Sequence, residues 1–176
     1  LHNTGKGFVE TTERSGFQGS RWSTSAAFLD YDRDGALDLV LGVLGGAYDP
    51  NTTTADNLLH LRQRPDGGWT LESRRLLSQI DVGSESVPSL VDLDGDGDLD
   101  LLVGNRIDPA DVLTSRMYLF ENQGDVGSPE LRESRPLDVE GAYHSAPAFG
   151  DLDGDGDLDL ILGTWRNELL GFENVG

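Results

Sequence analysis

A nine-residue acidic motif, Asp-x-Asp-x-Asp-Gly-x-x-Asp, occurs three times in this chain and constrains its fold more than any other feature. The copies lie at 30–38, 92–100 and 151–159, and each sits inside a segment of nineteen residues that aligns with the other two without gaps. Successive copies begin 62 and 59 residues apart. Regular self-similarity of this kind is the signature of a repeat architecture, in which every repeat is one supersecondary unit. The sequence therefore predicts three copies of a single structural unit.

Each unit is predicted to contain four short strands. In the first unit they span about residues 26–29, 37–41, 58–63 and 69–73. The second strand of every unit is nearly all apolar, as at 101–103, which is typical of a strand covered on both faces. No helix of useful length is indicated, and the 23 glycines favour many turns. Four-stranded units that repeat at about sixty residues predict a β-propeller.

The predicted fold class is all-β: a β-propeller-type array of about three four-stranded antiparallel blades that forms an arc of a larger propeller. The blades are expected at 20–79, 80–138 and 139–176, the last of them partial, and residues 1–19 are expected to be the end of a preceding blade. Closed propellers have about four to eight blades. Because three units cannot close a ring, we expect the ring to be completed by further blades of the same chain or by another subunit.

The repeated motif has the chemistry of a calcium loop. Carboxylates at positions 1, 3 and 5 converge when the chain turns tightly, and glycine at position 6 permits the sharp turn. A main-chain carbonyl at position 7 and a carboxylate at position 9 complete a shell of about six or seven oxygens, which suits Ca²⁺. We expect about three ions, one per blade. The predicted ligands are Asp30, Asp32, Asp34, Ala36, Asp38, Asp92, Asp94, Asp96, Asp98, Asp100, Asp151, Asp153, Asp155, Asp157 and Asp159.

An acidic turn without metal is the alternative interpretation, because Asp and Gly are common turn residues. Three copies in register argue against it, since four or five carboxylates in one turn repel one another strongly without a cation. The chain carries 32 acidic and 13 basic residues, a net charge of −19, and fourteen of the acids lie in the three loops. This charge excludes electrostatic binding to nucleic acid or to an anionic membrane surface. The chain has no cysteine and no apolar run long enough to span a membrane.

The repeat resembles the FG-GAP/VCBS family, whose blades build propellers of the integrin α type. The resemblance covers nearly the whole chain, and it implies calcium binding by the loop aspartates. It also implies a secreted, periplasmic or cell-surface location, where free calcium suits loops of modest affinity. The Gly-Ala-Pro that follows the second strand in integrin-like repeats is absent, since Gly42-Val, Gly104-Asn and Gly163-Thr stand there. The chain is therefore more similar to bacterial-style VCBS variants, which weakens any inference of integrin-like ligand binding.

A partner surface for a protein or a glycan is expected on the face opposite the calcium loops. Antiparallel strands send their connections alternately to two faces, and connections that differ between units often mark the binding face. Trp, Tyr and Arg are frequent interface residues, and Glu85 lies in the same connections. The alternative is that the aromatic residues pack between blades and the arginines offset nearby acids. The candidate residues are Arg21, Trp22, Tyr48, Arg106, Tyr143, His144, Trp165 and Arg166.

We expect a calcium-stabilised propeller that acts as an extracytoplasmic protein-interaction or scaffolding module, without catalysis. The histidines at 2, 60 and 144 occupy different repeat positions, and no Ser-His-Asp order, phosphate loop or zinc pattern is present. The alternative is a carbohydrate-active propeller. A polysaccharide lyase would need a base near the propeller centre, for which Tyr143, His144 and Arg166 are the candidates. A lectin-like glycan binder would stack sugars on Trp22 and Trp165.

Overall fold

The computed structural model is all-β apart from one helical turn. It describes residues 2–3, 5–15, 23–43, 58–71, 82–106, 108, 115–124, 130–137, 144–165 and 168–175. The first sheet contains β3 (Ser23–Leu29), β4 (Asp38–Val43), β5 (Leu58–Gln63) and β6 (Trp69–Leu71). The second contains β7 (Val87–Val91), β8 (Asp100–Gly104), β9 (Met117–Asn122) and β10 (Leu131–Leu137). The third contains β11 (Ala146–Gly150), β12 (Asp159–Gly163) and β13 (Leu169–Phe172).

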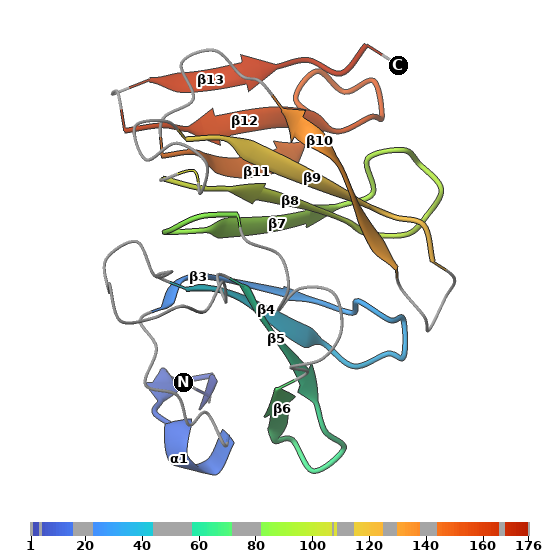
Figure 1. Cartoon of the computed structure of the whole chain (residues 1–176). Helices are drawn as coiled ribbons and strands as arrows, with labels where there is room; N and C mark the ends of the chain where they lie inside the picture. Colours follow the sequence, from blue (N-terminus) through green and yellow to red (C-terminus); the bar gives the residue numbers. More distant parts are fainter. Residues whose placement is uncertain are drawn as a thin grey trace.

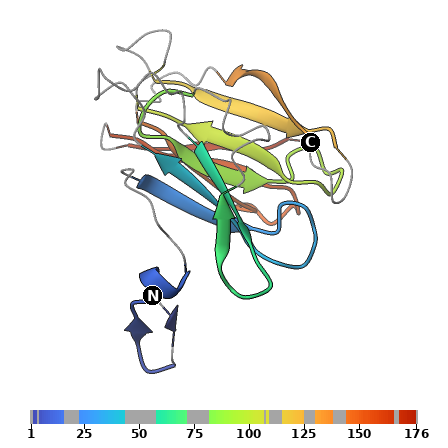
Figure 2. The same cartoon turned by 60° about the horizontal axis from the view of Figure 1, so that its bottom comes forward.

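A small N-terminal element precedes these sheets. It consists of β1 (His2–Asn3) paired with β2 (Phe8–Val9), followed by α1 (Thr12–Ser15). This element lies at the end of the molecule opposite the third sheet (Figure 1) and stands apart from the three sheets (Figure 2). Among the described residues, no helix has the length and apolar character needed to cross a membrane.

Every sheet is an antiparallel meander, with strands paired in chain order. The prediction of repeated antiparallel strands is therefore confirmed, with four strands in the first two units and three among the described residues of the third. In the first unit β5 has the predicted bounds, whereas β3 begins three residues earlier than predicted and β4 ends two residues later. Residues 72–73, predicted to end the fourth strand, lie outside the described residues.

The second sheet lies between the other two (Figure 1). Its first strand, β7, contacts both β3 and β11, so that the first strands of the three sheets lie next to one another. Successive side chains of a strand point to opposite faces. In β8, Leu101 and Val103 accordingly join a core shared with the first sheet, while Leu102 joins a core shared with the third. All of β8 is buried, as its continuous apolar run predicted.

In the first two units, a glycine at or next to the end of the second strand permits the next sheet to approach closely. A methyl group on Gly42 would overlap the carbonyl oxygen of Ser86, and one on Gly104 would overlap that of Ser145. The Ser86 carbonyl also accepts hydrogen bonds from the hydroxyls of Thr24 (3.0 Å) and Ser25 (2.7 Å). The same backbone contact thus recurs at both junctions between sheets.

Candidate metal centre

Each acidic loop connects the first and second strands of its sheet. The loop at 30–38 joins β3 to β4, that at 92–100 joins β7 to β8, and that at 151–159 joins β11 to β12. The glycine at position 6 has a positive φ in all three loops, at 86° in Gly35, 91° in Gly97 and 102° in Gly156. Non-glycine residues rarely adopt this conformation, so the spacing of the motif is a local requirement of the turn.

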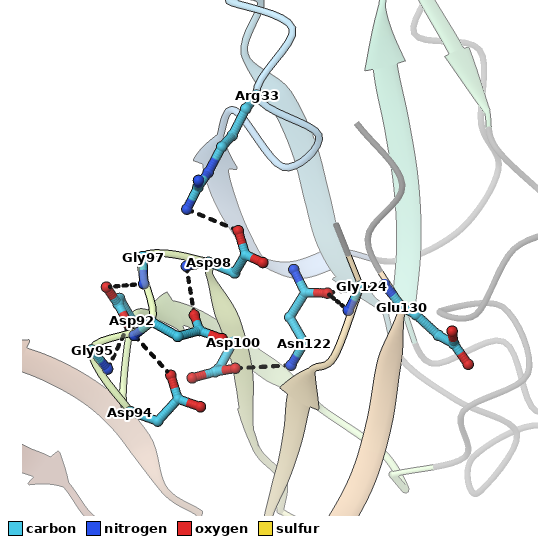
Figure 3. A network of polar contacts seen from close by, with 11 residues as sticks. Arg33, Asp92, Asp94, Gly95, Gly97, Asp98, Asp100, Asn122, Gly124 and Glu130 are labelled. Atoms are coloured by element: carbon cyan, nitrogen blue, oxygen red, sulfur yellow. Dashed lines mark hydrogen bonds and ion pairs between the residues drawn. The ribbon is translucent and has the colours of Figure 1, made fainter. Parts of the chain in front are cut away.

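The loop backbone is held by the aspartates themselves. In the second loop, the carboxylate of Asp92 accepts N–H bonds from Gly95 (2.8 Å) and Gly97 (3.0 Å), as drawn in Figure 3. Oδ1 of Asp94 accepts the N–H of Asp96 at 3.2 Å, and Oδ1 of Asp96 accepts that of Asp98 at 2.8 Å. Residues at position 7 therefore help to form the turn through their amides, and Ala36 and Asp157 donate in the same way to Asp34 and Asp155.

Three carboxylates gather in each loop closely enough to hold one metal ion. In every group the three potential ligand oxygens lie within 4.8 Å of one another. The first two loops group positions 1, 3 and 5, as the sequence predicted, whereas the third groups positions 1, 3 and 9. The groups are Asp30, Asp32 and Asp34; Asp92, Asp94 and Asp96; and Asp151, Asp153 and Asp159.

Three carboxylate oxygens in these loops favour a bound cation. Oδ1 of Asp30, Oδ2 of Asp38 and Oδ1 of Asp157 are buried and accept no hydrogen bond. A buried carboxylate oxygen without a donor is unfavourable unless a cation or another proton donor satisfies it. Together with the all-oxygen composition of the loops, this observation fits a hard cation.

The carboxylate at position 9 is the most buried of each loop. Asp38, Asp100 and Asp159 are 2%, 2% and 1% exposed. The two oxygens of Asp100 accept N–H bonds from Leu93 (3.0 Å) and Asn122 (2.8 Å). Those of Asp159 are held in the same way by the amides of Leu152 and Asn174, at 2.7 and 2.9 Å. In the second and third loops this side chain therefore ties the loop to the end of the third strand or to the residues just after it, a role that the metal prediction did not include.

Two arginines of the first unit reach the loops, and neither was predicted from the sequence to do so. A terminal nitrogen of Arg62, on β5, lies 2.5 Å from Oδ2 of Asp32 and 2.7 Å from Oδ2 of Asp34. Its hydrogen bond lowers the pKa of Asp34, whereas burial raises the pKa of Asp32 despite the guanidinium charge. Arg33, at position 4 of the first loop, pairs instead with Asp98 of the second loop at 2.9 Å (Figure 3).

The opposite ends of the strands bring together three of the predicted partner-face residues. Arg106 lies over the ring of Trp165, 4.9 Å from its centroid, and the His144 ring centroid is 5.2 Å from that of Trp165. Glu85 accepts from Arg106 at 2.7 Å and lies 2.9 Å from Nε2 of His144. The other predicted residues, Arg21, Trp22, Tyr48, Tyr143 and Arg166, lie outside the described residues.

These four side chains come from two pairs of equivalent repeat positions. Glu85 and His144 each precede the first strand of a unit, and both have a positive φ, 54° and 57°. Arg106 and Trp165 each follow the second strand. Burial opposes ionisation of Glu85, but its hydrogen bonds with Arg106 and His144 prevail and lower its pKa. The side chains largely satisfy one another, and only Trp165 is widely exposed, at 65%. The cluster therefore acts first as a junction between the second and third units.

No family model matches the chain, and no curated protein matches it either. The function is therefore inferred from the acidic loops and from the junction cluster themselves.

Proposed function

We propose that the three acidic loops bind Ca²⁺, one ion in each unit, and that the chain is a calcium-stabilised β-propeller module. The observation that carries this proposal is the triple occurrence of carboxylate groups with potential ligand oxygens within 4.8 Å of one another. Carboxylates held this close repel one another, and a cation removes the repulsion. Each ion would fasten the turn between the first and second strands of its sheet.

The donor set favours calcium over other cations. The loops offer only oxygen, and neither cysteine nor histidine occurs within them. Soft and borderline metals prefer sulphur and nitrogen ligands, while Mg²⁺ prefers fewer carboxylates and retains water. A loop with aspartates at four or five of nine positions, as at 92–100, can supply the larger and more flexible shell that Ca²⁺ takes.

The repeated junction geometry supports a propeller arrangement. The first strands β3, β7 and β11 are neighbours, and the close backbone approach at Gly42 recurs at Gly104. Repetition of one junction generates a regular array of sheets, and further units of the same chain or another subunit would close the ring. A native mass spectrum of the protein from its source would show whether additional units or a second chain accompany these residues.

The module is proposed to present a rigid surface outside the cytoplasm, without catalysis. Extracellular and periplasmic calcium concentrations suit loops of modest affinity. The face that carries Arg106, His144 and Trp165 is the proposed partner face, because it lies at the strand ends opposite the loops. Arg and Trp are the residues that most often dominate protein interfaces.

Glycan binding is a second candidate, favoured by one observation. The indole of Trp165 is 65% exposed and is flanked by Arg106 and His144, an arrangement in which an apolar sugar face and its hydroxyls can both be contacted. A glycan array would separate this function from protein binding. A polysaccharide lyase would further require a free base, and His144 is instead paired with Glu85.

The calcium proposal is tested by titrating metal-free protein with Ca²⁺ and with Mg²⁺ in a calorimeter and counting bound ions by native mass spectrometry. We expect Ca²⁺ to bind and to raise the melting temperature. At a hundredfold excess over Kd, each bound ion should add about 2.7 kcal/mol to the free energy of unfolding. Asp94→Asn should lose one ion. Glu130→Gln is the matched control, because Glu130 pairs with Arg132 on the surface and belongs to no loop group. An unchanged ion count in Asp94→Asn would refute the assignment of the second loop.

A further inference from the structure

The first loop already contains a cation that belongs to the chain. Oδ1 of Asp32 accepts the amide of Asp34 at 3.3 Å, and Oδ1 of Asp34 accepts that of Ala36 at 2.8 Å. Arg62 pairs with the other oxygen of each carboxylate, Oδ2. The guanidinium therefore occupies the oxygens that these turn hydrogen bonds leave available. It contacts two of the three carboxylates in the group that could hold a metal.

The other two units have the opposite charge at the position of Arg62. Strand pairing aligns Leu61 with Leu39 in the first sheet and Phe120 with Leu101 in the second. In the third sheet it aligns Phe172 with Leu160. The next residue along the third strand of each unit is therefore Arg62, Glu121 or Glu173. At this one repeat position beside the loop, the first unit has a cation and the other two units each have an anion.

Arg62 does not satisfy the whole of the first loop. The Asp38 side chain is 3% exposed, and its Oδ2 accepts no hydrogen bond, although His60 Nε2 lies 3.6 Å away. Oδ1 of Asp30 is also buried without a donor. In the second and third loops, by contrast, Oδ2 of the ninth-position aspartate accepts a backbone amide. The first loop thus retains unsatisfied carboxylate oxygens that a second cation could contact.

We propose that Arg62 acts as a built-in competitor for calcium in the first loop, which makes this loop the weakest of the three calcium sites and the least dependent on calcium for its structure. The inference rests on the proposed calcium function. The stronger sites are the second and third loops, where the equivalent residue is acidic.

Competition follows from the geometry. A calcium ion that uses Asp32 and Asp34 must displace a guanidinium from both, or share their oxygens with a like charge. In the metal-free protein, the same guanidinium offsets the repulsion between these carboxylates. The Arg62 side chain is 44% exposed, so solvent screens the pair and the effect on affinity is moderate. We expect about a tenfold difference, at the lower end of what one charge-assisted hydrogen bond corresponds to.

The test compares Arg62→Gln with Arg64→Gln in calcium calorimetry of the full chain. Arg64 is a matched control, because it lies two residues away and pairs with Asp66 outside the loops. The parent should bind two ions tightly and one about tenfold more weakly. Arg62→Gln should tighten the weak site about tenfold and Arg64→Gln should not. Asp32→Asn should remove the weak site alone, which assigns it to the first loop.

Two further measurements separate competition from a general effect of charge. Glu121→Arg, the reciprocal change in the second unit, should weaken one tight site. In EDTA, Arg62→Gln should melt at a lower temperature than Arg64→Gln, because only the former leaves the loop carboxylates unopposed. Three sites of equal affinity that Arg62→Gln leaves unchanged would overturn the competition while leaving the calcium function intact. No heat with any variant would instead remove the calcium function, and this inference with it.

Discussion

The second and third loops have the same nine residues, Asp-Leu-Asp-Gly-Asp-Gly-Asp-Leu-Asp, and yet lie in different surroundings. Both loops have the following hydrogen bonds in common. The carboxylate at position 1 accepts a glycine amide, those at positions 3 and 5 each accept a backbone amide, and that at position 9 accepts the amide of position 2. The leucines of the second loop are partly buried, whereas Leu152 and Leu158 of the third are 58% and 38% exposed.

The neighbouring sheet accounts for this difference. Tyr31 and Leu99 both pack against the core shared by the first and second sheets, and Arg33 of the first loop reaches Asp98. The second loop has Leu93 and Gly95 at the positions of Tyr31 and Arg33, so it has no arginine that could reach the loop at 151–159 in the same way. Local sequence therefore determines how the loop turns, and the preceding unit determines how far it is shielded from water.

The two loops also differ in the pKa shift of the aspartate at position 9. Burial raises the pKa of Asp100 although two backbone amides oppose the shift. For Asp159 the amides of Leu152 and Asn174 dominate and lower the pKa. Equivalent aspartates with equivalent backbone partners thus differ in the direction of their pKa shift, because desolvation outweighs the backbone hydrogen bonds at Asp100 but not at Asp159.

The largest expected loss of stability comes from substitutions in the second strands of the sheets. Leu101 is completely buried, whereas the equivalent Leu160 is only partly buried in the smaller core. Leu101→Ala should cost about 3 kcal/mol of unfolding free energy, because it leaves a cavity between two sheets. Leu160→Ala should cost about 1 kcal/mol. Chemical denaturation at fixed calcium concentration measures both, and equal losses would contradict the difference in burial.

The next largest difference in stability is expected between substitutions of Gly104 and Gly163, the glycines that end β8 and β12. Gly104→Ala should cost about 2 kcal/mol, because the new methyl group overlaps the Ser145 carbonyl and the sheets must separate. At Gly163 the nearest atoms would be 3.7 Å away, so Gly163→Ala should change stability by less than about 0.5 kcal/mol. Thermal unfolding of the two variants tests this. A large loss at Gly163 would indicate that a further unit packs there.

A smaller effect is expected at the junction of the second and third units. Because the pKa of Glu85 is below its ordinary 4.5 in the folded protein, ionised Glu85 stabilises the fold above that pH, and the contribution disappears as the pH falls through the folded pKa. Glu85→Gln should therefore cost about 1 kcal/mol at about pH 7 and less at about pH 3. Unfolding of parent and variant across this range measures the difference. A loss that is independent of pH would show that packing, not charge, links the units.

The smallest effect concerns the ion pair between the first and second loops. Arg33 has a positive φ of 55°, at the position where the other loops carry Gly95 and Gly154. Arg33→Gly removes the pair with Asp98 but also relieves this backbone conformation, so the net change should be within about 0.5 kcal/mol. The free energy of unfolding of Arg33→Gly should therefore depend less on salt concentration than that of the parent. Arg132→Gln, which breaks an exposed pair within one sheet, is the control in denaturation at low and high salt.

Much of the fold could be predicted from the sequence because its signals are local. The run at 101–103 indicated a strand covered on both faces, and β8 is entirely buried. The Asp and Gly spacing placed the turns and the three acidic groups, apart from the exchange of Asp155 for Asp159 in the third. That exchange depends on side-chain orientation, which residue spacing does not specify.

The roles of the arginines could not be predicted from the motif. Arg62 is 28 residues from Asp34 along the chain, and only the register of β5 against β4 brings them together. A comparison of repeat positions could have marked it, since Glu121 and Glu173 stand at the equivalent places. Arg33 likewise departs from glycine in an otherwise regular loop, but its partner lies in the next unit.

By itself, the sequence determined that the chain repeats one antiparallel unit and that each unit carries an acidic turn, because both features depend on short-range spacing. Only the tertiary structure decided that Glu85, Arg106, His144 and Trp165 meet at one junction. It also decided that two identical loops differ in burial and acidity, and that one loop has an arginine in contact with its carboxylates. These features depend on strand register and on how neighbouring sheets pack, which bring together residues far apart in the chain.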